Sequence, residues 1–104
     1  MSGRFACIWQ FHVAPASREA FLLQYGPRGS WAQLFRAHRG YLGTQLLQDI
    51  GDPDRFLTVD SWESEQSYRA FRSAAAAEYK RLDALCEGLT TQELLVGAFH
   101  QPGG

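Results

Sequence analysis

The apolar residues of this chain follow two patterns, short continuous runs and longer stripes with helical spacing. The runs are rich in branched and aromatic residues and end at turn-forming residues, so they predict strands. They lie at residues 4–13, 41–49, 55–63 and 93–100. The sequence IGDPD separates the second and third runs, and its glycine, proline and aspartates favour a turn. We therefore expect these two strands to form an antiparallel hairpin.

The stripes predict helices in the connections between these strands. One helix follows the first strand and ends at Gly26-Pro27, and a second, shorter helix begins with Ser30 as its N-cap. After the third strand, Ser64 is expected to cap a long helix whose apolar stripe continues to Cys86, with or without a kink. The elements therefore follow the order strand, helix, strand, strand, helix, strand.

This order is that of the ferredoxin-like α+β fold, βαββαβ, in which helices cover one face of a four-stranded antiparallel sheet. The other face is expected to carry Ile8 and Leu46 or their alternating neighbours, a surface too apolar to remain in water. We therefore predict a homodimer in which a second copy covers this face. A single domain is expected to span residues 1–104, with frayed ends at 1–4 and 101–104.

Charge and composition narrow the range of partners. Ten basic and eleven acidic residues give a net charge of -1 without a run of either sign, so neither nucleic acid nor an anionic membrane is an expected partner. The sequence has no apolar run of membrane-spanning length, and its first residues lack the pattern of a signal peptide. Cys7 and Cys86 fit buried free thiols in a reducing compartment. We expect a soluble cytoplasmic protein.

The segments GPRGSWAQLFRAHRGYLGTQLLQD, FLTVDSWESEQSYRAF, EYKRLDALCEGLT and ELLVGAF cover most of the chain. Together they resemble the antibiotic biosynthesis monooxygenase (ABM) family of dimeric α/β barrels. The resemblance implies that two ferredoxin-like sheets close face to face into a barrel. Some members of that family oxygenate phenolic or quinol-like polyketides with molecular oxygen and without a metal or flavin.

Other members of the same superfamily degrade haem, and this resemblance would imply an asparagine in the first strand and a tryptophan and a histidine on the second helix. The chain contains no asparagine, and residues 64–90 contain no histidine or tryptophan. Haem degradation is therefore disfavoured. Because the sequence also has no glycine-rich nucleotide motif and no clustered metal ligands, we expect a protein without a cofactor.

Asp60 is the least expected residue of the third predicted strand, where it lies two positions before Trp62. Aspartate is disfavoured in strands, and a buried carboxylate is costly unless it is paired or hydrogen-bonded. We expect Leu57, Val59 and Ser61 to pack on the helices, which leaves Asp60 and Trp62 facing the cavity of the barrel. There, burial would raise the pKa of Asp60 and suit it as a catalytic base. Alternatively, Asp60 pairs with an arginine or caps the following helix.

Other residues are candidates for the same site. His100 is expected near the same end of the sheet as Asp60 and is a second candidate acid or base, with His12 as a third. The two histidines should lie at opposite ends of neighbouring antiparallel strands, so we expect no shared metal site. The candidates for substrate contacts are Trp62, Gln10, Trp31 and Tyr79.

Two functional hypotheses follow from the sequence. The first is a cofactor-independent monooxygenase that acts on a small aromatic, phenol-like or quinol-like molecule, with molecular oxygen as co-substrate. Such chemistry needs a substrate that is electron-rich enough to reduce oxygen after it has lost a proton. The second is a non-catalytic dimeric module that binds a small ligand, because the fold tolerates the loss of chemistry.

Overall fold

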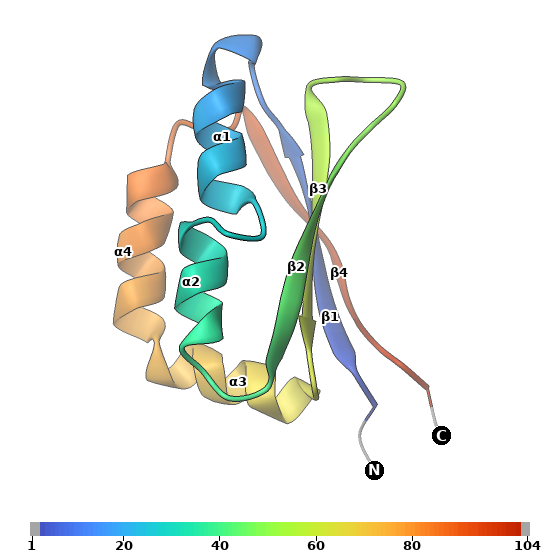
Figure 1. The fold of residues 1–104 in the computed structure, drawn as a ribbon, viewed down its shortest axis with the longest axis vertical. Coiled ribbons are helices and arrows are strands. Elements are labelled where there is room, and N and C mark those ends of the chain that lie inside the picture. Colours follow the sequence, from blue (N-terminus) through green and yellow to red (C-terminus); the bar gives the residue numbers. More distant parts are fainter. Residues whose placement is uncertain (1–2, 103–104) are drawn as a thin grey trace.

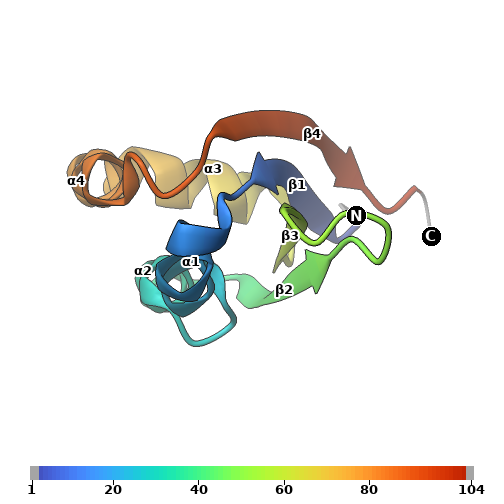
Figure 2. The ribbon, with the colours of Figure 1, turned by 90° about the horizontal axis from the view of Figure 1, so that it is seen from above.

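Helices cover one face of a four-stranded antiparallel sheet, which confirms the predicted ferredoxin-like α+β fold (Figure 1, Figure 2). The computed structural model describes residues 3–102. The outer parts of the predicted frayed ends, residues 1–2 and 103–104, lie outside the described residues. The backbone amide of Gln101 donates a hydrogen bond to the carbonyl of Arg4 at 2.8 Å, just beyond the paired strands.

The elements follow the predicted order. The strands are β1 (Phe5–His12), β2 (Tyr41–Gln48), β3 (Arg55–Trp62) and β4 (Gln92–His100). The helices are a short 3-10 helix (Pro15–Ser17), α1 (Arg18–Tyr25), α2 (Ser30–Arg36), α3 (Glu65–Ala74) and α4 (Ala76–Cys86). The strand order in the sheet is β2-β3-β1-β4, and each neighbouring pair is antiparallel.

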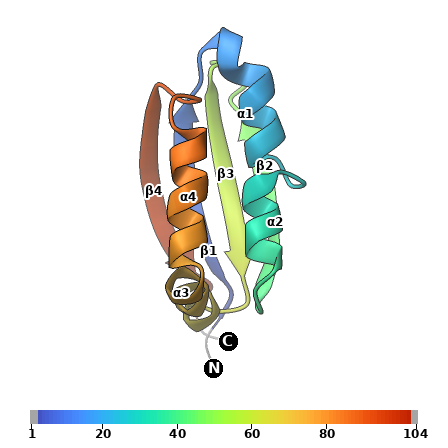
Figure 3. The same ribbon diagram turned by 90° about the vertical axis from the view of Figure 1, so that its left-hand side faces the viewer.

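The long helix predicted after β3 is divided at Ala75 into α3 and α4, which run in different directions (Figure 1). Ala75 has φ -104° and ψ 20°, and its side chain is buried. Ser64 caps α3 as predicted, because its Oγ accepts a hydrogen bond from the amide of Ser67 at 3.1 Å. The predicted cap at Ser30 is wrong, since Gly29 is the N-cap of α2. The turn at Ala75 brings α4 alongside α2 over the sheet (Figure 3).

β3 buries alternate side chains against the helices, and its orientation differs from the prediction. Its buried residues are Phe56, Thr58, Asp60 and Trp62, whereas Leu57, Val59 and Ser61 are only partly buried. The expectation that the second set packs on the helices is wrong. Phe56 packs on Phe21 of α1. Trp62 packs on Phe35 and Phe71. These two rings bury more apolar area than two aliphatic side chains would, and they determine which face is covered.

The opposite face of the sheet carries no helix within the described residues (Figure 2). Ile8 lies on this open face, as predicted. Leu46 does not, because it packs against the core, and the neighbouring Leu47 lies on the open face instead. Leu94 and Phe99 of β4 also lie there, and each is 50% exposed. The open face is therefore strongly apolar.

Two further expectations concern the whole chain. Cys7 and Cys86 are free and buried, as predicted. Burial raises the pKa of both thiols, so they stay protonated near neutral pH. Across residues 3–102, no helix combines the length and the apolar character that crossing a membrane requires.

Candidate active site

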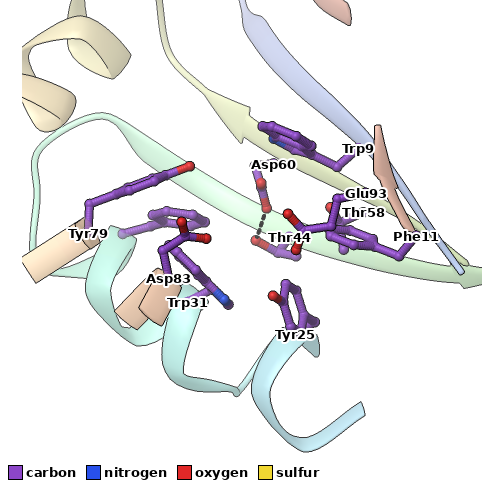
Figure 4. A pocket seen from close by; sticks show the side chains of 11 residues that line it. Trp9, Phe11, Tyr25, Trp31, Thr44, Thr58, Asp60, Tyr79, Asp83 and Glu93 are labelled. Carbon is purple, nitrogen blue, oxygen red and sulfur yellow. Dashed lines mark hydrogen bonds between the residues drawn. The ribbon is translucent and has the colours of Figure 1, made fainter. Parts of the chain in front are cut away.

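A pocket lies between the sheet and the helices, inside a single chain. Its volume is about 60 Å³. It is lined by Trp9, Phe11, Tyr25, Trp31, Phe35, Thr44, Thr58, Asp60, Tyr79, Asp83 and Glu93 (Figure 4). The sequence predicts a cavity on the other face of the sheet, within the barrel. The structure corrects this expectation, because the face of β3 that carries Asp60 is the one covered by helices.

The size and the walls of the pocket limit what it can hold. Six of its eleven lining residues are aromatic, so flat apolar surfaces surround the space. A bound water needs about 10–15 Å³ of cavity volume, so the pocket has room for about four to six waters, comparable to one small aromatic ring. A single-ring molecule therefore fits the pocket as it stands, whereas a fused ring system requires the walls to move.

Asp60 is held in the pocket by one hydrogen bond. It lies opposite Thr44 in the β2–β3 pair, and its Oδ1 accepts a hydrogen bond from Thr44 Oγ1 at 2.7 Å. Thr44 Oγ1 is in turn 2.6 Å from the hydroxyl of Tyr41. Within residues 3–102, Asp60 forms no salt bridge, and the cap of α3 is made by Ser64. The second carboxylate oxygen, Oδ2, has no hydrogen-bond partner among these residues.

Burial changes the acidity of this carboxyl group. The side chain of Asp60 is only 9% exposed, and loss of solvation raises its pKa from 3.8 to about 6. The hydrogen bond from Thr44 acts in the opposite direction but is the smaller effect. Asp60 is therefore mostly ionised at neutral pH and is a much stronger base than an exposed aspartate.

Tyr79 and Trp31 form the wall opposite the sheet (Figure 4). Their ring centroids are 5.0 Å apart in an edge-to-face arrangement. Mainly because of burial, the pKa of Tyr79 is raised to about 12, although the charge of Arg72 acts against this. The guanidinium of Arg72 lies 4.0 Å from the centroid of the Tyr79 ring. The Tyr79 hydroxyl is therefore protonated at neutral pH and available as a donor.

Two further carboxylates, Asp83 of α4 and Glu93 of β4, line the pocket, and we call them the acidic mouth. Both are exposed, in contrast to Asp60. The pKa of Glu93 is raised, chiefly by burial and then by the charge of Asp83. The mouth therefore marks the side of the pocket that opens to solvent.

The family of the chain is given by its sequence. Residues 4–81 match the model of a family described as antibiotic biosynthesis monooxygenase. The chain belongs to the ABM family. No sequence among the curated proteins matches it. The matched residues include Asp60 and Tyr79, whereas Asp83 and Glu93 lie beyond them.

Solved structures similar to this ABM chain share its fold. PA3566 from Pseudomonas aeruginosa is 20% identical with a TM-score of 0.69, and the match covers 99% of this chain and 98% of that one. A conserved protein from Methanosarcina mazei is 11% identical with a TM-score of 0.72, over 97% and 95% of the two chains. SnoaB, a cofactor-independent oxygenase from Streptomyces nogalater, is 18% identical with a TM-score of 0.69, over 99% and 97%.

The structure brings some of the predicted site residues of this ABM chain together and leaves others apart. Trp31 and Tyr79 line the pocket with Asp60. Trp62 is fully buried in the core and is not among the lining residues. Gln10 accepts a hydrogen bond from Arg55 Nη2 at 2.8 Å, away from the pocket.

The two histidines are also apart from the pocket. His12 pairs with Gln92 at one end of the β1–β4 ladder, and His100 pairs with Phe5 at the other end, as the sequence predicted. Neither lines the pocket. Within residues 3–102, no group of three or more His, Cys, Asp or Glu side chains is placed to hold a metal ion.

Sequence reasoning missed Thr44, Asp83 and Glu93. A signal for Thr44 was present, because a hairpin centred on Asp52 places Thr44 opposite Asp60. Glu93 is an acidic residue directly before the apolar residues of β4, the same kind of signal that identified Asp60. Asp83 gave no such signal, because an aspartate on an exposed helix flank is ordinary.

Proposed function

We propose that this chain is a cofactor-independent monooxygenase that oxidises a small, single-ring phenol or hydroquinone with molecular oxygen. The observation that carries the proposal is Asp60, a buried carboxylate with one oxygen free of protein hydrogen bonds in the described part of the chain, on the wall of an aromatic pocket. Membership of the ABM family and the fold shared with SnoaB, a cofactor-independent oxygenase, support it.

Asp60 would act as the general base. A phenol bound in the pocket donates its O–H to Oδ2, and the proton moves to the carboxylate, which leaves an electron-rich phenolate. A pKa of about 6 suits this step, because the group is ionised at neutral pH yet basic enough to share a phenolic proton. The hydrogen bond from Thr44 fixes the orientation of the carboxylate.

The phenolate then supplies the electrons for oxygen reduction. It gives one electron to molecular oxygen, and the superoxide and phenoxyl radical combine at a ring carbon ortho to the phenolic oxygen, where the proton held by Asp60 completes a hydroperoxide. Loss of the hydrogen on that carbon as a proton and cleavage of the O–O bond release water and leave an ortho-quinone, or a hydroxyquinone when the substrate is a hydroquinone. One phenol and one oxygen molecule give one quinone and one water, so no external reductant is needed.

The walls of the pocket have two roles in this scheme. The aromatic side chains exclude water from the radical pair, which prevents competing reactions. The protonated hydroxyl of Tyr79 is a donor for negative charge that develops on an oxygen atom of the substrate.

Oxygen uptake with a panel of substituted hydroquinones tests the proposal. We expect uptake above the uncatalysed rate, with kcat/KM rising with pH through about 6 as Asp60 ionises. Asp60→Asn keeps the shape and the acceptor for Thr44 but cannot take the proton, so kcat/KM should fall by about 100-fold or more. Glu63→Gln, at an exposed acidic residue just after β3, is the control and should have no effect.

Two results would contradict the proposal in different ways. Unchanged activity of folded Asp60→Asn would remove Asp60 as the base. Uptake at the uncatalysed rate for every hydroquinone, together with a ligand-dependent rise in melting temperature, would instead support the non-catalytic binding module.

A further inference from the structure

The pocket has two ends of different chemical character. The inner end holds Asp60, which is 9% exposed, and the outer end is the acidic mouth formed by Asp83 and Glu93. The mechanism proposed above uses Asp60 and leaves the mouth without a role. Asp83 and Glu93 lie beyond residues 4–81, so the family match assigns no role to either of them.

The charges on the pocket wall are all negative. Three of the eleven lining residues are acidic and none is Lys, Arg or His. Asp83 and Glu93 are close enough for the charge of one to affect the other. Within residues 3–102, neither carboxylate forms a salt bridge. A group that enters past the mouth therefore meets unneutralised negative charge.

Two cationic side chains lie nearby without neutralising the mouth. Lys80 borders a surface groove together with Asp83 and Glu93, but it forms no salt bridge with any residue of the described chain. Arg72 packs over the ring of Tyr79 and donates a hydrogen bond to the hydroxyl of Tyr68 at 3.0 Å. Neither side chain lines the pocket.

From this arrangement we propose that the molecule bound in the pocket is a single-ring phenol that carries a protonated amine. The phenol lies at Asp60, the ring lies between the aromatic walls, and the amine reaches Asp83 and Glu93. Tyr25 and Trp31 line the same pocket, and a cation is attracted to the face of an aromatic ring. A carboxylate on the same side chain would instead be repelled by the mouth. The inference rests on the proposed function for the position of the phenol.

Three phenols with short para side chains of different charge test this by binding alone. They are tyramine, para-ethylphenol and para-hydroxyphenylpropionate, which are cationic, neutral and anionic near neutral pH. Isothermal titration at low ionic strength gives Kd for each, and no oxidation is needed. Because two exposed carboxylates attract the cation and repel the anion, we expect tyramine to bind about 10-fold or more tightly than the propionate.

Substitutions of Asp83 and Glu93 test whether these two residues cause the preference for tyramine over the propionate. In Asp83→Asn/Glu93→Gln the ratio of the two Kd values should fall to within about twofold, while the affinity for para-ethylphenol changes by less than about twofold. Glu19→Gln/Glu78→Gln removes the same charge from exposed positions outside the pocket and should keep the ratio. Lys80→Gln should raise the ratio, because it removes a positive charge from the groove that Asp83 and Glu93 also border.

The outcomes separate this inference from the proposed function. Three results would each overturn the inference that the bound phenol carries an amine. They are equal Kd values for the cation and the anion, no binding of tyramine, and the same loss of preference in Glu19→Gln/Glu78→Gln. If a neutral hydroquinone is oxidised in the same preparation, the proposed function stands without the inference. If no hydroquinone is oxidised but the preference depends on Asp83 and Glu93, the inference stands and the oxygenase does not.

Discussion

Asp60 combines burial with a single hydrogen bond, and this has a cost in folding free energy. The ionised carboxylate has lost most of its solvation. Within the described residues, its one hydrogen bond comes from Thr44, and it forms no salt bridge that would offset the lost solvation. Groups with such perturbed pKa values cluster at functional sites. The same pKa makes stability depend on pH, in a direction that follows from the sign of the change.

The pKa of Asp60 is higher in the folded chain, about 6, than its ordinary value of 3.8. Well below about pH 4 the carboxyl group is protonated in both the folded and the unfolded chain, so it does not lower the free energy of unfolding. As pH rises to about 6, the group ionises more readily in the unfolded chain than in the folded chain, and the free energy of unfolding therefore falls. The full loss above that window is about 3 kcal/mol. Asp60→Asn avoids it, so the variant should be more stable than wild type near neutral pH by up to about 3 kcal/mol.

Urea unfolding across this pH range measures the effect. The difference between Asp60→Asn and wild type should be small at about pH 4 and grow to a plateau above about pH 6. Glu78→Gln, at an exposed residue of α4, should differ from wild type by no more than about 0.5 kcal/mol throughout. A variant that is less stable than wild type at neutral pH would mean that the carboxylate stabilises the fold.

At the scale of elements, the order of strands and helices and the capping residue of α3 could be predicted from local sequence. The orientation of β3 could not, because both of its alternating sets contain apolar residues. The choice depends on the rings of α1, α2 and α3 against which Phe56 and Trp62 pack. The sequence predicts Asp60 in the cavity of the barrel, on the open face of the sheet, whereas Asp60 lines a pocket on the face covered by helices.

The acidic mouth depends on contacts that are distant in sequence. Asp83 reaches the pocket because the chain turns at Ala75, and a stretch of five residues rich in alanine gives no local reason for that turn. Glu93 reaches it through the pairing of β4 with β1, opposite Phe11. Both positions are set by tertiary packing, which local propensity does not determine.

The cap of α3 offers a test at this scale. Ser64→Ala removes the acceptor for the amide of Ser67, so the free energy of unfolding should fall by about 1 kcal/mol. Ser73→Ala, on an exposed position of the same helix, should change stability by less than about 0.5 kcal/mol. Urea unfolding measures both. Equal effects of the two substitutions would show that the cap contributes nothing specific.

At the scale of the whole molecule, the open face of the sheet is an apolar surface that a single chain leaves exposed to solvent. It carries apolar side chains on all four strands, including the central Ile8 and Val59 and, near the edges, Leu47 and Leu94. Such a surface favours burial against another protein. A second copy of the same chain fits best, because a two-fold axis would place identical apolar faces against each other.

We therefore predict a homodimer that buries a total of at least about 1,600 Å². Wild type should sediment as a dimer at micromolar concentration, and Leu47→Asp/Leu94→Asp should shift it to monomer by placing charges on the open face. Leu23→Asp/Leu85→Asp, at leucines of α1 and α4 that are 71% and 76% exposed, should leave the dimer intact. Because the pocket lies within one chain, the monomeric variant should still bind a phenol. A wild-type monomer would contradict the dimer, whereas loss of phenol binding in the folded monomer would show that the partner completes the pocket.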